Sequence, residues 1–223
     1  MDIKEAIVKR HSVRQYKEDP IPAEKAAELE ELIAEVNRES GLHVQLILED
    51  PECFDVLLAS YVKLKNVKNY FAIVGPKSMD NLEETGGYYG QRLVLAAQMM
   101  GLNTCWMGGT FSKARCRAEI GEGEKIVCVI ALGLGETQGT EHNSKPMAKL
   151  CSVPEGEMPD WFREGVEAAM QAPTAMNQQK FKIALEDGEP VVTAGKGMMT
   201  KIDLGIVKYN FEAASGHKCI DNR

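Results

Sequence analysis

The stretch GQRLVLAAQMMG, residues 90–101, decides how the chain is interpreted. Between Gln91 and Met100 it is a strong helix former whose apolar residues lie on most sides, which is typical of a buried helix. A second stretch, GIVKYNFEAASG (205–216), has the same length, the same helical character and the same bracketing glycines. The pair raises the question of an internal repeat.

Two further segments match in the same order. ELEELIAEVNRESGLHVQLILED (28–50) and WFREGVEAAMQAPTAMNQQKFKIALED (161–187) both have the pattern of a helix, a loop and a strand, and both end in LED. The identities are few, and chance similarity is the alternative. Two matches in one order favour two degenerate copies of one unit.

The rest of the chain mixes helical and strand patterns without any low-complexity segment. Two continuous apolar runs, 70–75 and 125–133, predict buried strands. This mixture predicts an α+β fold. The other expected elements are strands at 42–50 and 180–186, helices at 2–10, 23–38, near 52–60, 84–102, 158–171 and 203–216, and a glycine loop at 105–111.

Composition narrows the function classes. The 223 residues suffice for one large domain or two small ones, and the net charge of −7 argues against nucleic acid as the main partner. The N-terminus does not have the pattern of a signal peptide, and no apolar run approaches the roughly 20 residues that span a bilayer. The six cysteines form no CxxC pair and no metal-ligand cluster, so we expect no metal and a reducing cytoplasm.

The segment RHSVR (10–14) places Arg10, His11 and Arg14 around Ser12 where the first predicted helix ends. Helix ends attract cations, so a solvated basic turn is one interpretation. Forked guanidinium groups beside a hydroxyl also suit an anion such as phosphate. Taken alone, this segment leaves both interpretations open.

Four segments together resemble the nitroreductase family of flavoproteins. The first is the R-x-S-x-R motif that follows an initial helix. The second is a loop of the form A-P-S-x-x-N-x-Q, here with Thr174 in the usual serine position. The resemblance covers nearly the whole chain, although each motif alone is modest. The segments are AIVKRHSVRQY (6–16), GQRLVLAAQMMGLNTCWMGGTF (90–111), KIVCVIALGLGETQGTEHNSKP (125–146) and APTAMNQQ (172–179).

The resemblance implies a nitroreductase-like α/β/α fold with FMN as the cofactor. Because the flavin carries the chemistry, no catalytic side chain is expected. The implied FMN-binding residues are Arg10, His11, Ser12, Arg14 and Lys145 at the phosphate, Pro173, Thr174, Ala175 and Asn177 at the ring edge, Gly108 and Gly109 near flavin N5, and Lys63 and Lys65 near N1 and O2. The alternatives are a solvated face for the two lysines, a helix C-terminal loop for 172–179 and a tight turn for 105–111.

The sequence departs from the family pattern in one respect. Ordinary members are homodimers that hold each flavin between subunits, and their second motif follows the first by one helix. Here the intact loop lies in the second copy, and the first copy has only NRESGLH (37–43) at that place. The chain thus resembles the branch known as putative TM nitroreductases, in which one chain looks like a fused pseudo-dimer. We expect a first half, 1–150, with the phosphate site and a second half, 151–223, with the flavin-facing loop.

This interpretation implies one FMN per chain and a monomer, because the family's dimer interface would lie inside the chain. The expected activity is NADH- or NADPH-dependent reduction of a small-molecule acceptor, such as a nitroaromatic or a quinone, by ping-pong hydride transfer through flavin N5. Two alternatives stay open: a flavin-binding protein without turnover, acting as a store or sensor, and a cofactor-less interaction module of the same fold.

Overall fold

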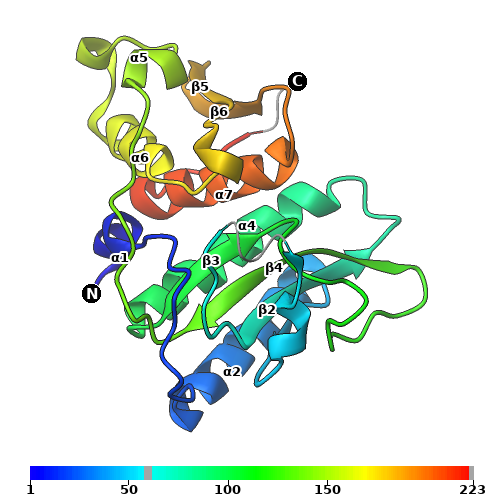
Figure 1. Ribbon diagram of the computed structural model, residues 1–223. Coiled ribbons are helices and arrows are strands. Elements are labelled where there is room, and N and C mark those ends of the chain that lie inside the picture. The colour runs from blue at the N-terminus through cyan, green and yellow to red at the C-terminus, as the bar shows by residue number, and fades with distance from the viewer. Residues whose placement is uncertain (58–61, 221–223) are drawn as a thin grey trace. The chain divides into compact units, whose positions relative to one another are not determined.

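The computed structural model describes residues 1–57 and 62–220 (Figure 1). The chain forms two compact units, each made of segments far apart in sequence. The sheet unit comprises 10–82 and 93–141, and the helical unit comprises 1–9, 83–92 and 142–223. Helix α4 (Leu82–Met99) contributes to both units. These units differ from the two repeat halves expected from the sequence, which stay a prediction.

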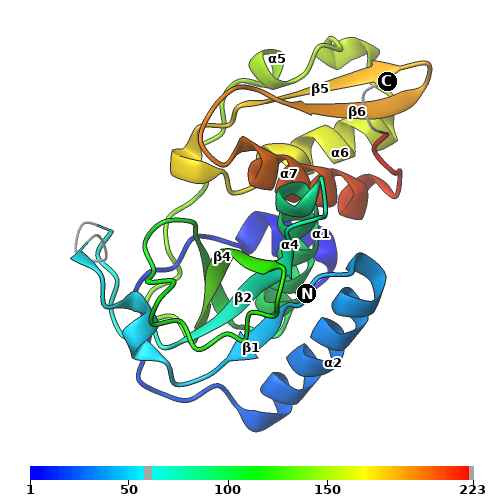
Figure 2. The same ribbon diagram turned by 90° about the vertical axis from the view of Figure 1, so that its right-hand side faces the viewer.

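A four-stranded antiparallel sheet forms the centre of the sheet unit, in the order β1-β2-β4-β3. Figure 1 labels β2, β3 and β4, and Figure 2 labels β1, β2 and β4. The two apolar runs predicted to be buried strands are its central pair, and every residue of β2 except Pro76 is buried. Helix α2 (Ala23–Ser40) packs on β1 and ends at Gly41, whose φ of 71° lies in the left-handed region that favours glycine. The strands are β1 (Gln45–Ile47), β2 (Asn69–Pro76), β3 (Asn103–Met107) and β4 (Glu124–Gly133).

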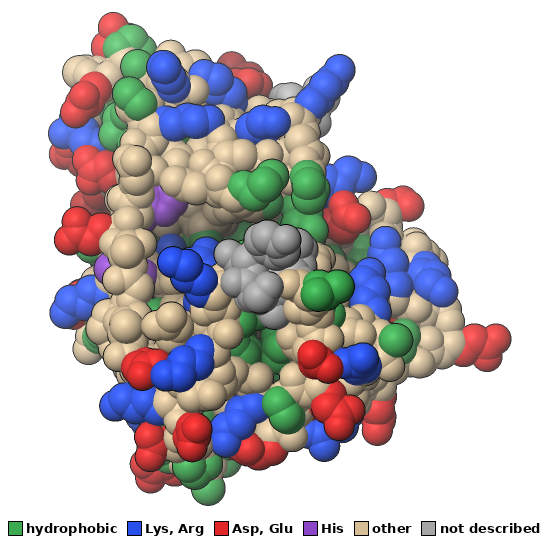
Figure 3. Space-filling view, viewed as in Figure 1, with side chains coloured by type: hydrophobic (Ala, Val, Ile, Leu, Met, Phe, Trp, Pro, Cys, Tyr) green, Lys and Arg blue, Asp and Glu red, His purple; other side chains and the backbone are tan. Residues whose placement is uncertain are grey.

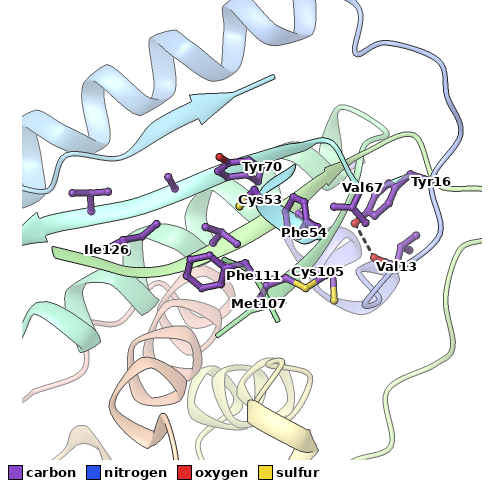
Figure 4. Packing of buried hydrophobic residues seen from close by; sticks show 14 residues of the cluster. Val13, Tyr16, Cys53, Phe54, Val67, Tyr70, Cys105, Met107, Phe111 and Ile126 are labelled. Carbon is purple, nitrogen blue, oxygen red and sulfur yellow. Dashed lines mark hydrogen bonds between the residues drawn. The ribbon is translucent and has the colours of Figure 1, made fainter. Parts of the chain in front are cut away.

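One face of this sheet carries a hydrophobic cluster (Figure 4). Tyr70, Ala72 and Val74 alternate along β2 and therefore face the same side. The cluster also takes in Val13 and Tyr16, and the Tyr16 hydroxyl donates to the Val13 carbonyl at 2.7 Å. The core of the sheet unit thus anchors the segment in which the basic motif lies.

The helical unit combines helices with a two-stranded hairpin. The expected strand at 180–186 is β5, and a second strand that the sequence analysis did not anticipate pairs with it as β6. Asp187 and Gly188 join them with φ values of 52° and 85°, a pattern typical of a tight hairpin turn. The elements are α1 (Ile3–Lys9), α5 (Met147–Leu150), η2 (Glu155–Glu157), α6 (Asp160–Met170), η3 (Ala175–Asn177), β5 (Phe181–Glu186), β6 (Glu189–Ala194) and α7 (Thr200–Ser215).

Within the helical unit, α7 crosses the first part of α4 at backbone contact. A Cβ atom on Gly205 would lie 1.9 Å from the Glu84 carbonyl oxygen. Beside the crossing, Lys208 Nζ lies 2.5 Å from a Glu84 carboxylate oxygen, and Gln91 Nε2 donates to Asn210 Oδ1 at 2.9 Å. The stretches 90–101 and 205–216, which were matched in the sequence, therefore do meet. The closest approach, however, is between Gly205 and Glu84, which precedes the first stretch. A pseudo-twofold relation between them stays a prediction.

Three expected elements differ from the structure. The strand expected at 42–50 is reduced to Gln45–Ile47. The segment expected as a glycine loop from residue 105 begins as β3, because Asn103–Met107 pairs with β4. Of the helix expected near 52–60, Pro51–Phe54 form the 3₁₀ helix η1, and 58–60 lie outside the described residues. None of the described helices combines the length and the apolarity needed to cross a membrane.

Candidate functional site

The basic motif continues past α1 as an extended segment held by backbone hydrogen bonds. Val13 N donates to Thr104 O at 3.0 Å, on β3. The backbone of Lys65 holds the residues that follow, since Lys65 N donates to Arg14 O at 3.0 Å and Tyr16 N donates to Lys65 O at 3.1 Å. The motif is therefore a fixed part of the sheet unit rather than a frayed helix end.

A cavity of about 390 Å³ lies beside this segment within the sheet unit. Two of its lining side chains, Arg14 and Lys63, are cationic, and Ser12 contributes a hydroxyl. No acidic side chain is among the described lining residues. We call Ser12, Arg14 and Lys63 the cradle; two cations and a hydroxyl are a donor set that suits an anion such as a phosphate. The described lining comprises Ser12, Arg14, Gln15, Val62, Lys63, Thr137, Gly139 and Thr140.

Arg10 and His11 have other surroundings. Arg10 is only 3% exposed and is not among the described lining residues. Burial lowers the pKa of its guanidinium to about 10, so Arg10 stays charged at neutral pH. His11 Nδ1 lies 3.0 Å from the Gln138 carbonyl oxygen, next to Gly139, which lines the cavity. His11 therefore holds the 137–140 loop, whereas Arg10 is buried in the sheet unit.

The two lysines that the sequence grouped together are separated by the structure. Lys63 lines the cavity and has a φ of 57°, an uncommon value for a residue with a side chain. Lys65 instead pairs with Glu136, with Nζ 3.1 Å from a carboxylate oxygen. Because strained backbone tends to gather at ligand sites, Lys63 is the stronger candidate of the two.

Gly108 and Gly109 follow β3 in the sheet unit. A Cβ on Gly109 would meet no atom within 4 Å, so packing among the described residues does not demand glycine there. That open space is compatible with a ligand close to the backbone and equally with an exposed turn. The geometry leaves both interpretations in place.

The 172–179 loop lies in the helical unit and is strained. Met176, Asn177 and Gln179 have φ values of 51°, 52° and 45°, in the left-handed region. Such a run costs energy and persists only where surrounding contacts fix it. Met176 at its tip is 79% exposed, whereas Pro173 is buried.

Asp203, at the start of α7, provides the contacts that fix this loop. Its two carboxylate oxygens accept hydrogen bonds from Ala175 N at 2.9 Å and from Gln178 Nε2 at 2.8 Å. Burial raises the pKa of Asp203, while both hydrogen bonds oppose that shift. Asp203 was not among the residues predicted from the sequence, because an acid in the first turn of a helix has an ordinary explanation in the helix dipole.

Several residues predicted to bind FMN also hold this loop. Lys145 Nζ donates to the Gln178 carbonyl at 2.5 Å and to the Gln179 carbonyl at 3.3 Å. Asn177 Nδ2 donates to Asn143 O at 2.9 Å, and Thr174 Oγ1 accepts from Gln179 N at 3.0 Å. Lys145 is thus tied to the loop in the helical unit and is not among the described residues that line the cavity in the sheet unit.

Charge on the visible surface is mixed. Figure 3 shows Lys and Arg side chains interspersed with Asp and Glu on the face that it draws, with no extended surface of one sign. This distribution is unlike the basic stripe expected of a nucleic-acid-binding face. Within the described chain, no group of three or more His, Cys, Asp or Glu side chains could hold a metal ion.

Comparison with solved structures identifies similar folds. A "putative nitroreductase" from Thermotoga maritima is 23% identical, with a TM-score of 0.74 over 100% of this chain and 90% of that chain. A "putative nitroreductase" from Desulfovibrio desulfuricans, solved in complex with FMN, is 19% identical, with a TM-score of 0.53 over 70% of this chain and 98% of that chain. A nitroreductase-like protein from Streptococcus mutans is 14% identical, with a TM-score of 0.56 over 68% and 97% of the two chains. At these identities, the likeness concerns the fold.

One family model matches almost the full chain. Among curated proteins, no match was found. The family model described as "Putative TM nitroreductase" matches residues 2–215, which include the basic motif, the cradle, the 172–179 loop and Asp203. The resemblance drawn from the four sequence segments is thereby confirmed, and the chain belongs to the putative TM nitroreductase family.

Proposed function

We propose that the protein is an FMN-dependent oxidoreductase that takes electrons from NADH or NADPH and passes them to a nitroaromatic or a quinone. The observation that carries the proposal is the cavity lined by Ser12, Arg14 and Lys63, with no acid among its described lining residues. Family membership and the FMN bound in the Desulfovibrio desulfuricans relative support it.

In this proposal the cradle binds the FMN phosphate. Arg14 offers a forked pair of N–H donors, Lys63 adds a point charge, and the Ser12 hydroxyl donates a hydrogen bond. FMN, when bound, supplies the hydride chemistry. The chain supplies binding and orientation, so no catalytic acid or base is assigned.

The 172–179 loop is proposed to face the flavin ring. Asp203 and Lys145 position it by holding its backbone and its glutamines. The strained φ values fit a loop whose shape is fixed before a ligand arrives. Because the cradle and this loop each occur once in the sequence, we propose one FMN per chain and a monomer in dilute solution.

The first test is the identity of the cofactor. We expect the purified protein to be yellow and to release FMN rather than FAD, because the cradle is suited to a terminal phosphate. Mass spectrometry of the released flavin and a flavin-to-protein titration check this, with light scattering for the oligomeric state. Release of FAD, two FMN per chain or an obligate dimer would contradict the proposal.

The second test is steady-state turnover with menadione or a nitrofuran as acceptor. Donor and acceptor are expected to occupy the same ring face in turn, so double-reciprocal plots at several acceptor concentrations should give parallel lines. Intersecting lines would require donor and acceptor to be bound together. A protein that binds FMN but does not oxidise NADH or NADPH would be a flavin store or sensor. A protein that binds no flavin would be an interaction module.

A further inference from the structure

Two cysteines from separate loops of the sheet unit meet at the edge of its core. Cys53, in η1, is completely buried, and Cys116, beyond β3, is partly exposed. Their thiols are close enough to hydrogen-bond to each other. Figure 4 shows Cys53 next to Tyr70 in the hydrophobic cluster, and the Tyr70 hydroxyl oxygen is 3.2 Å from the Cys116 sulfur. Neither cysteine has a role in the proposed flavin chemistry.

The loops that carry the two thiols are held together at several points. Ser112 N donates to Cys53 O at 2.7 Å, and Cys116 N donates to Ser112 O at 3.0 Å. Arg115 Nη1 also donates to the carbonyl of Asp55, the residue after η1, at 3.2 Å. These bonds keep the two cysteine-bearing loops side by side.

The environment makes the two thiols unequal. The Tyr70 hydroxyl lies 2.5 Å from an Asp50 carboxylate oxygen and 3.2 Å from the Cys116 sulfur, and the Cys53 thiol also hydrogen-bonds to Cys116. This hydrogen bond lowers the pKa of Cys116 and raises the pKa of Cys53. Cys116 is also the more exposed of the two. A partly exposed thiolate beside a protonated thiol is the arrangement of an attacking and a resolving cysteine.

We propose that Cys116 and Cys53 form a hydroperoxide-reactive dithiol site, in which Cys116 attacks the peroxide and Cys53 resolves the product as an intramolecular disulfide. The hydroperoxide is the oxidant. This site lies wholly in the sheet unit, and it requires no flavin.

The reaction balances in two steps. The Cys116 thiolate attacks the terminal peroxide oxygen, the O–O bond breaks, and the leaving alkoxide or hydroxide takes a proton from water. Cys116 is then a sulfenic acid. Cys53 sulfur next attacks the Cys116 sulfur, the S–O bond breaks, and the Cys53 proton leaves with the hydroxyl group as water. The net change oxidises two thiols to one disulfide and reduces one hydroperoxide to an alcohol or to water.

The test uses the full chain with one equivalent of hydrogen peroxide at neutral pH. We expect two of the six thiols to be lost. Peptide mapping should show a disulfide that joins the Cys53 and Cys116 peptides, and dithiothreitol should restore both thiols. Dimedone should trap a sulfenic acid on Cys116 at least about tenfold faster than on Cys219, which is also partly exposed.

Variants separate the two roles. Cys53→Ser should accumulate the trapped sulfenic acid on Cys116, whereas Cys116→Ser should abolish the disulfide. Cys219→Ser is the matched control and should behave as the unmodified chain. The wild-type peptide map decides the matter even if a variant folds poorly. Equal reactivity of Cys116 and Cys219, or a peptide map without the 53–116 link, would overturn the proposal.

Discussion

Gly205→Ala is expected to lower the free energy of unfolding by about 3 kcal/mol or more. The new Cβ would lie 1.9 Å from the Glu84 carbonyl oxygen and 2.5 Å from Tyr88 N, and both are backbone atoms of α4. Neither can rotate away, so α7 and α4 would have to separate within the helical unit. Contacts that flank the crossing, such as Gln91 with Asn210, would be lost as well.

Thermal unfolding followed by circular dichroism measures this effect. For a chain of this size, about 3 kcal/mol corresponds to a fall in midpoint of about 6 to 12 °C. Gly156→Ala is the matched control, because a Cβ there meets no described atom within 4 Å and Gly156 does not need a positive φ. If the Gly205→Ala and Gly156→Ala variants had the same unfolding midpoint, α4 and α7 would not cross as closely as the structure shows.

Arg14→Ala is expected to weaken FMN binding by about 1.5–3 kcal/mol, the scale of a hydrogen bond to a charged group. That corresponds to a rise in Kd of about 10- to 150-fold. Arg14 is exposed at the cavity, so its removal should leave the fold intact. Arg10→Ala should also weaken binding, but Arg10 is buried and its loss also disturbs packing. Arg14 is therefore the more informative position.

Fluorescence titration of the apoprotein with FMN measures this change, because flavin emission reports binding directly. Lys17→Ala is the matched control, since Lys17 is an exposed cation in the same extended segment and is not among the described lining residues. Its Kd should stay within about threefold of the unmodified chain. An Arg14→Ala protein that binds FMN as tightly as Lys17→Ala would place the phosphate elsewhere.

The sequence by itself determined the family and the main elements, and it predicted where an anion would bind. Apolar runs such as 70–75 and 125–133 predicted buried strands because burial on both faces leaves a continuous apolar pattern. The R-x-S-x-R motif drew attention to Ser12 and Arg14 because it occurs together with three other segments that resemble the same family. Buried strands and short motifs can be predicted without a structure, because both depend on residues that are close together in the sequence.

Only the tertiary structure decided which of the residues that the sequence had grouped together lie in the same environment. Arg10 and Arg14 look equivalent in RHSVR, yet Arg10 is buried and Arg14 lines the cavity. Lys63 also lines the cavity, whereas Lys65 pairs with Glu136. Asp203 was not found, because its link to the 172–179 loop depends on how α7 packs rather than on any local pattern. Short-range patterns record the chemistry of a residue, whereas its partners are set by contacts between segments far apart in the chain.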